Sequence, residues 1–295
     1  MLPRCVLIER ATEYDVLLAR HGTREAVRFF LTQRGLSLEV IEARHRQQHG
    51  FRAVVLGAIP SQWRRASIRR EELDRFLFED DDIIVVLGQD GLVANVAKYL
   101  TGQPVIGLNP LPGVNPGVLV PHAPPAAPDL LRDVAAGRAC LQERTMVEAE
   151  LDDGQSLTAL NEIFVGHVSH QSARYRLSLG DKEERQSSSG LIVATGTGAT
   201  GWAASLHLER HSSLVMPAPE ERRLAFFVRE PWPSGATGTS LTEGSLTGRE
   251  QLLVRSELAD GGVVFGDGIE TDRLAVGWGQ RVTVGVAGRV LALVV

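Results

Sequence analysis

The chain has 295 residues, which favours two domains over one small module because domains commonly have about 100 to 200 residues. Its 31 Lys and Arg residues against 36 Asp and Glu residues give a net charge of −5, which argues against binding nucleic acid or anionic membranes through a basic face. Only Lys98 and Lys182 are lysines, and neither follows a glycine and precedes a Ser or Thr, which excludes a P-loop NTPase.

The N-terminal half alternates short apolar runs with helical patterns. We expect strands at 5–8, 38–41, 83–87 and 104–108, and helices at 23–34 (capped by Thr23), 69–78, 92–100 and 126–136. Such alternation is typical of βαβ units with a parallel sheet. Residues 109–125 are rich in Pro and Gly and predict an irregular connection.

The second half consists mostly of predicted strands separated by turns. They lie at 146–151, 163–165, 175–179, 191–195, 224–228, 252–254, 263–265, 282–286 and 290–295, with one helix at 202–209. The fold class we predict is α/β plus mostly-β. A parallel-sheet α/β domain would cover residues 1–143, and a β-rich domain would cover 144–295.

The two cysteines, Cys5 and Cys140, have no CxxC spacing, which fits a reducing compartment better than a disulfide framework. No apolar run approaches 18 residues, and the apolar stretch near the start is too short for a signal peptide. We therefore expect a soluble cytoplasmic protein that binds no membrane.

The first candidate site is the turn formed by Gly88, Gln89, Asp90 and Gly91, between a predicted strand and a predicted helix. Open α/β folds bind ligands at such turns, where glycines let backbone amides approach phosphate oxygens. Asp90 would then project into the crevice. The alternative is a tight turn in which Asp90 caps the helix.

The second candidate is the stretch from Thr195 to Gly201, whose glycines have the GxGxxG spacing. A Rossmann fingerprint should open a βαβαβ half, but the residues that follow are almost wholly strands, which argues against a dehydrogenase. A turn whose hydroxyls and amides contact a nucleotide and a purely structural turn both remain open.

Two further candidates lie at strand ends. Asn161 and Glu162 enter the strand at 163–165, and Asp267 with Gly268 follows the strand at 263–265. Amide and carboxylate groups suit ribose hydroxyls, because a carboxylate accepts hydrogen bonds and an amide both donates and accepts. Acidic residues at strand ends are also common in ordinary turns, which is the alternative here.

The histidines include two pairs with the i, i+4 spacing of a helical zinc site: His45 with His49, and His207 with His211. The HExxH order is absent from both, and the sequence indicates no third ligand. We expect solvated helix faces and no metal held by the protein.

Together these motifs resemble the NAD kinase family, whose pattern is a Gly-Gly-Asp-Gly turn, an Asn-Glu pair at a strand start, a Thr- and Gly-rich turn and a late Asp. The matching stretches are 86–91, 105–109, 159–163, 188–191 and 195–200. The resemblance covers nearly the whole chain. It is closest to the mitochondrial type of animal NAD kinase, which shares the Ser-Ser-Gly-Leu stretch and the Thr-Gly-Thr-Gly turn. Residues 227–231 also resemble that branch.

The resemblance implies a reaction and a set of residues. Asp90 would accept the proton of the adenosine ribose 2′-hydroxyl of NAD as that oxygen attacks the terminal phosphoryl group of ATP, giving NADP. The active site would lie between the two domains. The substrate- and nucleotide-binding residues would be Gly88, Gly91, Asn109, Asn161, Glu162, Thr195, Thr197, Gly198, Thr200, Gly201, Trp202, Ser205 and Asp267.

The implied partners are NAD and ATP, with Mg²⁺ carried by the ATP phosphates rather than by an acidic cage of the protein. Exposed sheet edges would favour a homodimer or a higher homo-oligomer.

Two alternatives to the NAD kinase stay open. Gln89 replaces the second glycine of the pattern and Leu92 replaces a Thr or Asn, changes that a non-catalytic NAD(P)-binding or sensor protein would tolerate. A kinase for another hydroxyl substrate, such as a lipid or a sugar, is the other alternative. Ser189, where most bacterial members carry Asp, and Trp202, in place of a frequent Tyr, also depart from the pattern.

Overall fold

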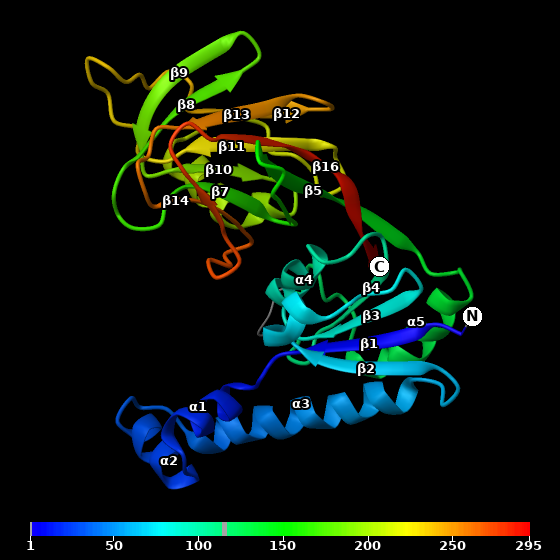
Figure 1. The fold of residues 1–295 in the computed structure, drawn as a ribbon. Coiled ribbons are helices and arrows are strands. Elements are labelled where there is room, and N and C mark those ends of the chain that lie inside the picture. Colours follow the sequence, from blue (N-terminus) through cyan, green and yellow to red (C-terminus); the bar gives the residue numbers. More distant parts are fainter. Residues whose placement is uncertain (1, 114–116) are drawn as a thin grey trace. The chain divides into compact units, whose positions relative to one another are not determined.

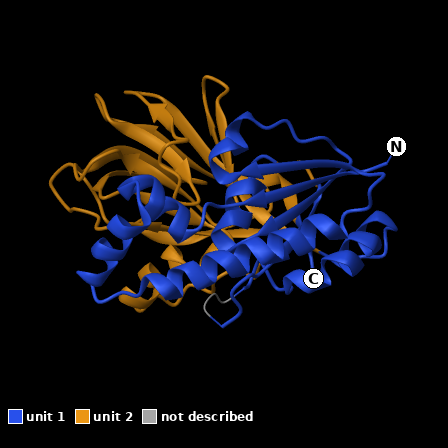
Figure 2. Ribbon diagram, turned by 90° about the horizontal axis from the view of Figure 1, so that it is seen from below, with its two compact units in different colours: residues 1–99, 103–141, 292–295 blue, residues 100–102, 142–291 orange. Residues whose placement is uncertain are grey.

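The computed structural model describes residues 2–113 and 117–295 and divides into two compact units (Figures 1 and 2). Unit 1 consists of Met1–Tyr99, Gln103–Leu141 and Ala292–Val295, and unit 2 of Leu100–Gly102 and Gln142–Leu291. The chain therefore enters unit 2 and returns to unit 1 with its last residues.

Unit 1 is a parallel sheet with helices. Its strands are β1 (Arg4–Glu9), β2 (Arg64–Arg69), β3 (Asp82–Leu87), β4 (Pro104–Leu108) and the last residues of β16 (Arg281–Val294). They are hydrogen-bonded in the order β2-β1-β3-β4-β16, and every pair is parallel. The helices are α1 (Glu13–His21), α2 (Arg24–Thr32), α3 (Leu38–Ala58), α4 (Asp90–Ala97) and α5 (Ala127–Ala135), with short 3₁₀ helices η1 (Arg70–Arg75) and η2 (Pro124–Ala126).

The core of unit 1 is built on β3, whose six residues are all buried, as expected for a central strand of a parallel sheet. Leu7 of β1 and Val85 of β3 contribute to one apolar cluster with Val55 of α3 and Leu131 of α5. Figure 1 shows α3 running along this sheet. The turn that follows β3 is therefore held on a fixed scaffold.

Two predicted elements of unit 1 are wrong: the helix expected at 69–78 is only the short 3₁₀ helix η1, because Arg69 belongs to strand β2 and residues 76–78 are not helical, and the strand expected at 38–41 is absent. Residues 38–41 are not a strand but the first turn of α3, where the Ser37 hydroxyl accepts a hydrogen bond from the backbone N–H of Val40. Short apolar runs do not distinguish a strand from a buried helix segment. Strand β2 was not expected, because it is a charged edge strand in which only Ile68 is buried.

Unit 2 is mostly β. Its strands are β5 (Leu141–Leu151), β6 (Ser156–Ala159), β7 (Glu162–His167), β8 (Ala173–Leu179), β9 (Lys182–Ser188), β10 (Leu191–Ala194), β11 (Arg223–Val228), β12 (Glu243–Thr247), β13 (Gln251–Ser256), β14 (Gly262–Gly266), β15 (Leu274–Val276) and the first part of β16. Its helices are η3 (Gly198–Thr200) and α6 (Trp202–Glu209), the latter with the predicted bounds.

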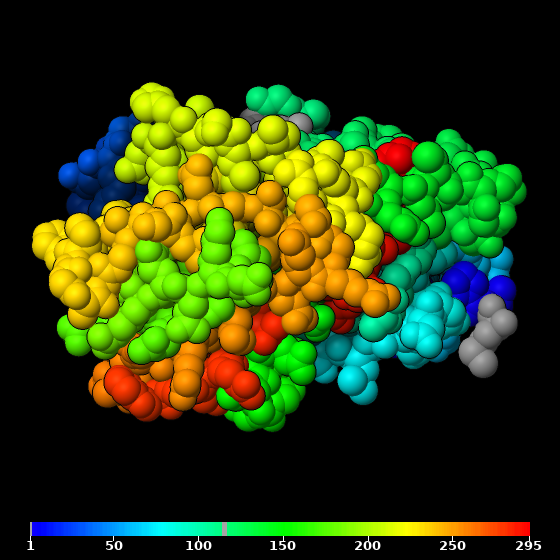
Figure 3. Space-filling view, turned by 90° about the horizontal axis from the view of Figure 1, so that it is seen from above, coloured from blue at the N-terminus to red at the C-terminus, as the bar shows by residue number. Residues whose placement is uncertain are grey.

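The strands of unit 2 form two antiparallel arrays. One has the order β12-β11-β10-β7-β14-β15, and the other runs from β16 through β13 and β8 to β9. Side chains of both arrays, among them Val193, Phe226 and Val254, share one buried cluster. Figure 3 shows the β8–β9 hairpin at the surface as a light green band beside orange residues.

The other face of the six-stranded array is covered by α6, where Ala203 and Leu206 pack with Ile192 and Phe227. The predicted fold class, an α/β part with a parallel sheet and a β-rich part, is confirmed. The strands expected at 282–286 and 290–295 are instead one strand, β16, which runs through Gly288 and Arg289. Over residues 2–113 and 117–295, every helix is too short or too polar to cross a membrane.

An ion pair between β1 and β3 gives a stability prediction. The Arg4 guanidinium donates to both carboxylate oxygens of Asp82 at 2.7 Å, and the Asp82 side chain is 0% exposed. Arg4→Met leaves that carboxylate buried without its cation and should lower the free energy of unfolding by about 3 to 5 kcal/mol in urea titrations. The exposed pair of Arg28 and Glu25 is the control, since Arg28→Met should cost about 1 kcal/mol or less. Equal losses would contradict this account.

Candidate functional site

The turn at residues 88–91, here called the GQDG turn, joins β3 to α4 in unit 1. The backbone N–H of Gly88 donates to the Leu108 carbonyl at 3.1 Å, and Asp90 is the first residue of the helix. Gln89 occupies the N-cap position without a side-chain cap bond, so the interpretation of Asp90 as the helix cap is wrong. The turn therefore leads directly into the amino end of α4, as predicted for a strand-to-helix turn.

The Asp90 carboxylate holds the segment 117–120. It accepts hydrogen bonds from the backbone N–H groups of Val118 at 3.2 Å, Leu119 at 2.8 Å and Val120 at 3.2 Å. A carboxylate offers about four acceptor positions, so one lone pair stays available for a ligand hydroxyl. The half-buried Asp90 is thus fixed in position by backbone that follows β4.

Gly107 of β4 packs directly on the segment 117–120, and Asn109 follows at the end of the strand. The Asn109 side chain is buried, and its Oδ1 accepts from the backbone N–H of Leu111 at 3.0 Å. A Cβ at Gly107 would lie 2.0 Å from the carbonyl oxygen of Leu119, so only glycine allows this close approach. The Asn109 side chain therefore holds the backbone that leaves β4, and Gly107 lets the segment bound by Asp90 pack against the strand.

A pocket of about 520 Å³ opens beside the GQDG turn, here called the arginine pocket. Gly88, Gln89, Gly91 and Leu92 form one wall. Arg10, Arg44 and Arg70 bring positive charge from three other parts of the chain and outnumber the two acidic lining residues, Glu13 and Glu71. A helix N-terminus together with guanidinium groups favours phosphate oxygens. Sequence reasoning missed the arginines, because they come from the end of β1, from α3 and from η1.

In unit 2, the predicted residues Asn161, Glu162 and Asp267 come together at the start of β7. The Asp267 carboxylate accepts from the backbone N–H of Leu160 at 2.9 Å and of Asn161 at 2.6 Å. Its own N–H donates to the Glu162 carbonyl at 3.0 Å, and its φ is 53°, which is unusual for a residue other than glycine. Asp267 thus fixes the turn that presents Asn161 and Glu162.

The side chain of Glu162 is held in an environment that disfavours its charge. Burial, and in second place the negative charge of Asp267, raise the pKa of Glu162 to about 7. A carboxyl group that titrates near neutral pH and can meet a ligand hydroxyl is typical of binding and catalytic sites.

The turn from Thr195 to Gly201, here called the Thr195 turn, packs on the same backbone. The buried Thr195 hydroxyl donates to the Leu160 carbonyl at 2.5 Å and accepts from the N–H groups of Thr197 and Gly198. A Cβ at Gly198 would lie 2.1 Å from the Asn161 carbonyl oxygen, so this position requires glycine. Because β10 pairs antiparallel with both neighbours, the GxGxxG spacing does not open a βαβ unit.

One polar atom of this turn stays unsatisfied. The Thr197 hydroxyl oxygen is buried and has no hydrogen-bond partner among the described residues. Buried hydroxyls nearly always have a partner, so an orphaned one beside Asn161 and Glu162 points to a ligand group. The Thr200 hydroxyl, in contrast, donates to the Thr197 carbonyl at 3.2 Å.

The remaining predicted residues lie at the start of α6. Trp202 stacks on Phe164 with ring centroids 5.8 Å apart, and the Arg229 guanidinium lies 5.1 Å from the Trp202 ring. These three side chains and Phe265 line a second pocket of about 430 Å³, here called the aromatic pocket. Its lining includes Trp202 but not the predicted residues Thr200, Gly201 or Ser205, of which Ser205 is exposed.

Phe164 and Phe265 were not predicted as site residues. Phe164 lies inside β7 and Phe265 inside β14, where an aromatic residue is indistinguishable in the sequence from an ordinary core residue. Aromatic faces with a guanidinium nearby suit a flat heterocycle, for which stacking is the favourable contact. The aromatic pocket thus adds a stacking surface to unit 2.

Comparison with curated proteins finds similarity to NAD kinases. An NAD kinase of Heliobacterium modesticaldum is 35% identical over 150 residues, which are 46% of this chain and 52% of the relative. An NAD kinase of Pectobacterium atrosepticum is 28% identical over 210 residues, 68% of this chain and 64% of the relative. No protein-family model matches the chain.

Solved structures give the fold. The yeast NADH kinase complexed with NADH superposes with a TM-score of 0.59 at 15% identity, covering 100% of this chain and 84% of that one. The Archaeoglobus fulgidus NAD kinase in complex with ATP gives a TM-score of 0.58 at 16% identity, covering 99% and 93%. The chain is similar in sequence to NAD kinases over part of its length and has the fold of these two structures.

The resemblance to NAD kinases expected from the motifs is thereby confirmed. The matches to the first curated NAD kinases span about half of the length of those relatives, from 44% to 52%. The nearer resemblance to the mitochondrial type stays a prediction, and so do the roles of the individual site residues.

The pKa of Glu162 gives a test in the folded protein. Its folded pKa near 7 lies above the unfolded value of 4.5, so the folded state holds an extra proton between these pH values. The contribution of Glu162 to stability should therefore fall by about 3 kcal/mol as pH rises from 4.5 to 7. Glu162→Gln should flatten the stability profile in this window relative to wild type, measured by urea unfolding. Parallel profiles would show that Glu162 titrates normally.

Proposed function

We propose that this chain is an ATP-dependent NAD kinase that transfers the terminal phosphoryl group of ATP to the 2′-hydroxyl of the adenosine ribose of NAD, giving NADP. The named relatives are NAD kinases, and the solved structures of this fold are complexes with NADH and with ATP. The observation that carries the proposal is the carboxylate of Asp90, held by three backbone N–H groups at a turn that borders a pocket of about 520 Å³ lined by three arginines.

Asp90 would act as the general base. The 2′-hydroxyl is a poor nucleophile at neutral pH, and a positioned carboxylate that accepts its proton contributes typically about 10² to 10⁴-fold to the rate. The bonds to segment 117–120 fix both carboxylate oxygens while leaving one lone pair for the hydroxyl. The O–P bond to ribose forms as the bond to the ADP leaving group breaks.

The phosphates of ATP would bind at the GQDG turn and in the arginine pocket. Arg10 and Arg44 are exposed and Arg70 is half-buried, so the pocket can receive a polyanion from solvent. Phosphoryl transfer needs mainly positioning and neutralisation of the charge on its equatorial oxygens, which guanidinium groups supply. Mg²⁺ would enter as part of the ATP substrate and add to that charge.

The dinucleotide would use the residues gathered in unit 2. Asn161, Glu162 and the orphaned hydroxyl of Thr197 offer a ribose or a base the donors and acceptors that their own turn leaves unused. Trp202 and Phe164 offer a stacking face for a flat ring. Asp267, by contrast, acts through the backbone N–H groups that it holds.

We also propose that the chain works in the cytoplasm as a homodimer or a higher homo-oligomer. The thiols of Cys5 and Cys140 are free, as suits a reducing compartment. Strands β9, β12 and β15 end their sheets, and such edges are natural surfaces for pairing with a second copy.

The test is formation of NADP from NAD and Mg-ATP by wild type, by Asp90→Asn and by a control, Asp129→Asn. The control changes an exposed carboxylate of α5 that pairs with Arg132. We expect Asp90→Asn to lose about 10² to 10⁴-fold in kcat while it still binds NAD, and the control to keep wild-type turnover.

Two other outcomes would identify a different function. NAD binding without turnover in wild type would identify a non-catalytic binder. Phosphorylation of a lipid or a sugar without reaction of NAD would identify a kinase for another hydroxyl. Assays with polyphosphate in place of ATP identify the phosphoryl donor. Assays with NADH in place of NAD show which form of the dinucleotide is accepted.

A further inference from the structure

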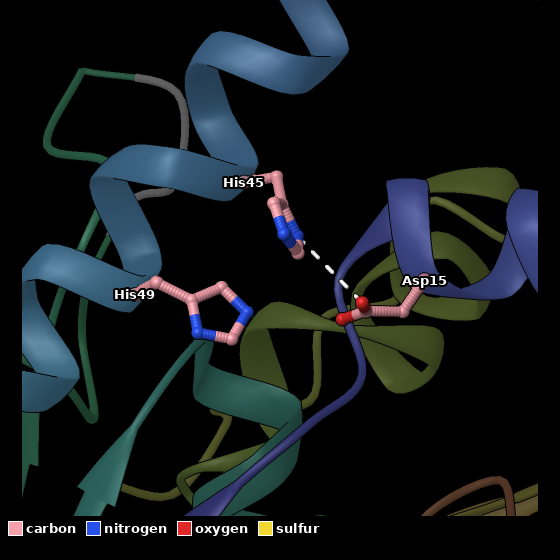
Figure 4. A group of neighbouring side chains, drawn as sticks. All are labelled: Asp15, His45 and His49. Carbon is pink, nitrogen blue, oxygen red and sulfur yellow. Dashed lines mark ion pairs between the residues drawn. The ribbon is translucent and has the colours of Figure 1, made fainter. Parts of the chain in front are cut away.

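Three side chains that could hold a metal ion meet outside the residues assigned above. Asp15 of α1 lies opposite His45 and His49 of α3, and each residue offers one ligand atom within 4.8 Å of the others (Figure 4). The sequence indicates only the histidine pair, because Asp15 is 30 positions from His45. Packing of α1 on α3 brings the third ligand to them.

The two histidines share one face of a regular helix. They are four residues apart in α3, and their ring centroids are 4.3 Å apart. This i, i+4 spacing lets two imidazoles bind one ion. Tetrahedral Zn²⁺ with bonds of about 2.0 to 2.2 Å would place its ligand atoms about 3.4 Å apart. The ligand atoms lie within 4.8 Å of one another, so they must come closer to hold the ion, and the exposed His49 side chain has room to rotate.

Thr12 orients the other two groups. Its hydroxyl donates to Asp15 Oδ2 at 2.8 Å, so the contact of 2.7 Å between its oxygen and His45 Nδ1 requires the imidazole to donate. Nε2 of His45 then carries the lone pair that a metal needs. In metal-binding histidines, the N–H of the ring nitrogen that does not bind the metal generally donates a hydrogen bond to a nearby oxygen, and this bond fixes the tautomer.

Asp15 supplies the negative charge. Its carboxylate accepts hydrogen bonds from the backbone N–H of Thr12 at 2.9 Å and from the Thr12 hydroxyl at 2.8 Å, both at Oδ2. Oδ2 serves the capping box at the start of α1, and Oδ1 faces His45 Nδ1 at 3.7 Å. Oδ1, which lies beside the His45 ring, is therefore the carboxylate oxygen left for an ion at Nε2.

We propose that Asp15, His45 and His49 bind a divalent transition-metal ion of the zinc type and thereby tie α1 to α3. Two imidazoles and one carboxylate leave a fourth position for water or a ligand oxygen, the arrangement of an open zinc site. Nitrogen ligands favour Zn²⁺ or Co²⁺ over Mg²⁺, so this site is distinct from the Mg²⁺ that accompanies ATP.

The site borders the arginine pocket. Thr12 and His45 line that pocket together with the GQDG turn, so a bound ion would add positive charge to its wall. A second group of possible ligands, Glu79, Asp81 and Asp82, does not carry a comparable inference, because Arg4 and Arg64 already pair with it.

The experiment titrates the metal-free, nucleotide-free chain with Co²⁺ and follows the visible d–d absorption, then competes with Zn²⁺. We expect one Co²⁺ per chain with the intense visible bands of a four-coordinate site, displaced by one Zn²⁺. His49→Gln, at an exposed position, should weaken binding at least 10-fold without unfolding the chain, and Asp15→Asn should weaken it similarly. Zn²⁺ should raise the melting temperature of wild type but not of His49→Gln.

Two controls make the result specific. His211→Asn changes a histidine of the other i, i+4 pair, and asparagine tolerates the φ of 50° found there, so Co²⁺ binding should be unchanged. Cys140→Ser removes the exposed thiol and should also leave binding unchanged. Absence of Co²⁺ binding at millimolar concentration, or equal binding by wild type and His49→Gln, would overturn the proposal. None of these readouts depends on kinase activity.

Discussion

The Asp90 carboxylate accepts hydrogen bonds from three backbone N–H groups, and the candidate site of unit 1 depends on this contact. Through it, the turn after β3 fixes the segment after β4, so that two neighbouring parallel strands share one polar end. Parallel α/β sheets bind ligands at this carboxyl edge. The bonds hold Asp90 in one orientation, as required of a group that must meet a single hydroxyl.

Unit 2 follows a similar principle with different residues. Asp267 holds the backbone of the turn before β7 from one side, and Thr195 holds it from the other. Because these two side chains are used in this way, they are positioning residues. Within residues 2–113 and 117–295 the Thr197 hydroxyl has no hydrogen-bond partner, and we propose that it and the Glu162 carboxyl meet the ligand. Burial raises the pKa of Glu162 to about 7, so this side chain can donate a hydrogen bond below neutral pH and only accept one above it.

Much of the fold could be predicted, because strong local patterns survive in the folded chain. The uninterrupted apolar run of β3 and the amphipathic α5 are where the sequence places them. Prediction failed where local signals were ambiguous, as at 38–41, or absent, as in β2 with its single buried residue. The candidate site was predictable only as separate motifs. Asp267 meets Asn161 across 106 positions, a distance at which residue patterns give no information on contact.

The measurement that tests the central claim most directly is a crystal structure of the chain with NAD bound. The account predicts an Asp90 carboxylate oxygen within about 2.6 to 3.2 Å of the adenosine ribose 2′-oxygen, with the hydrogen bonds to segment 117–120 retained. A complex in which NAD is bound and its 2′-oxygen lies beyond hydrogen-bonding distance of Asp90 would contradict it.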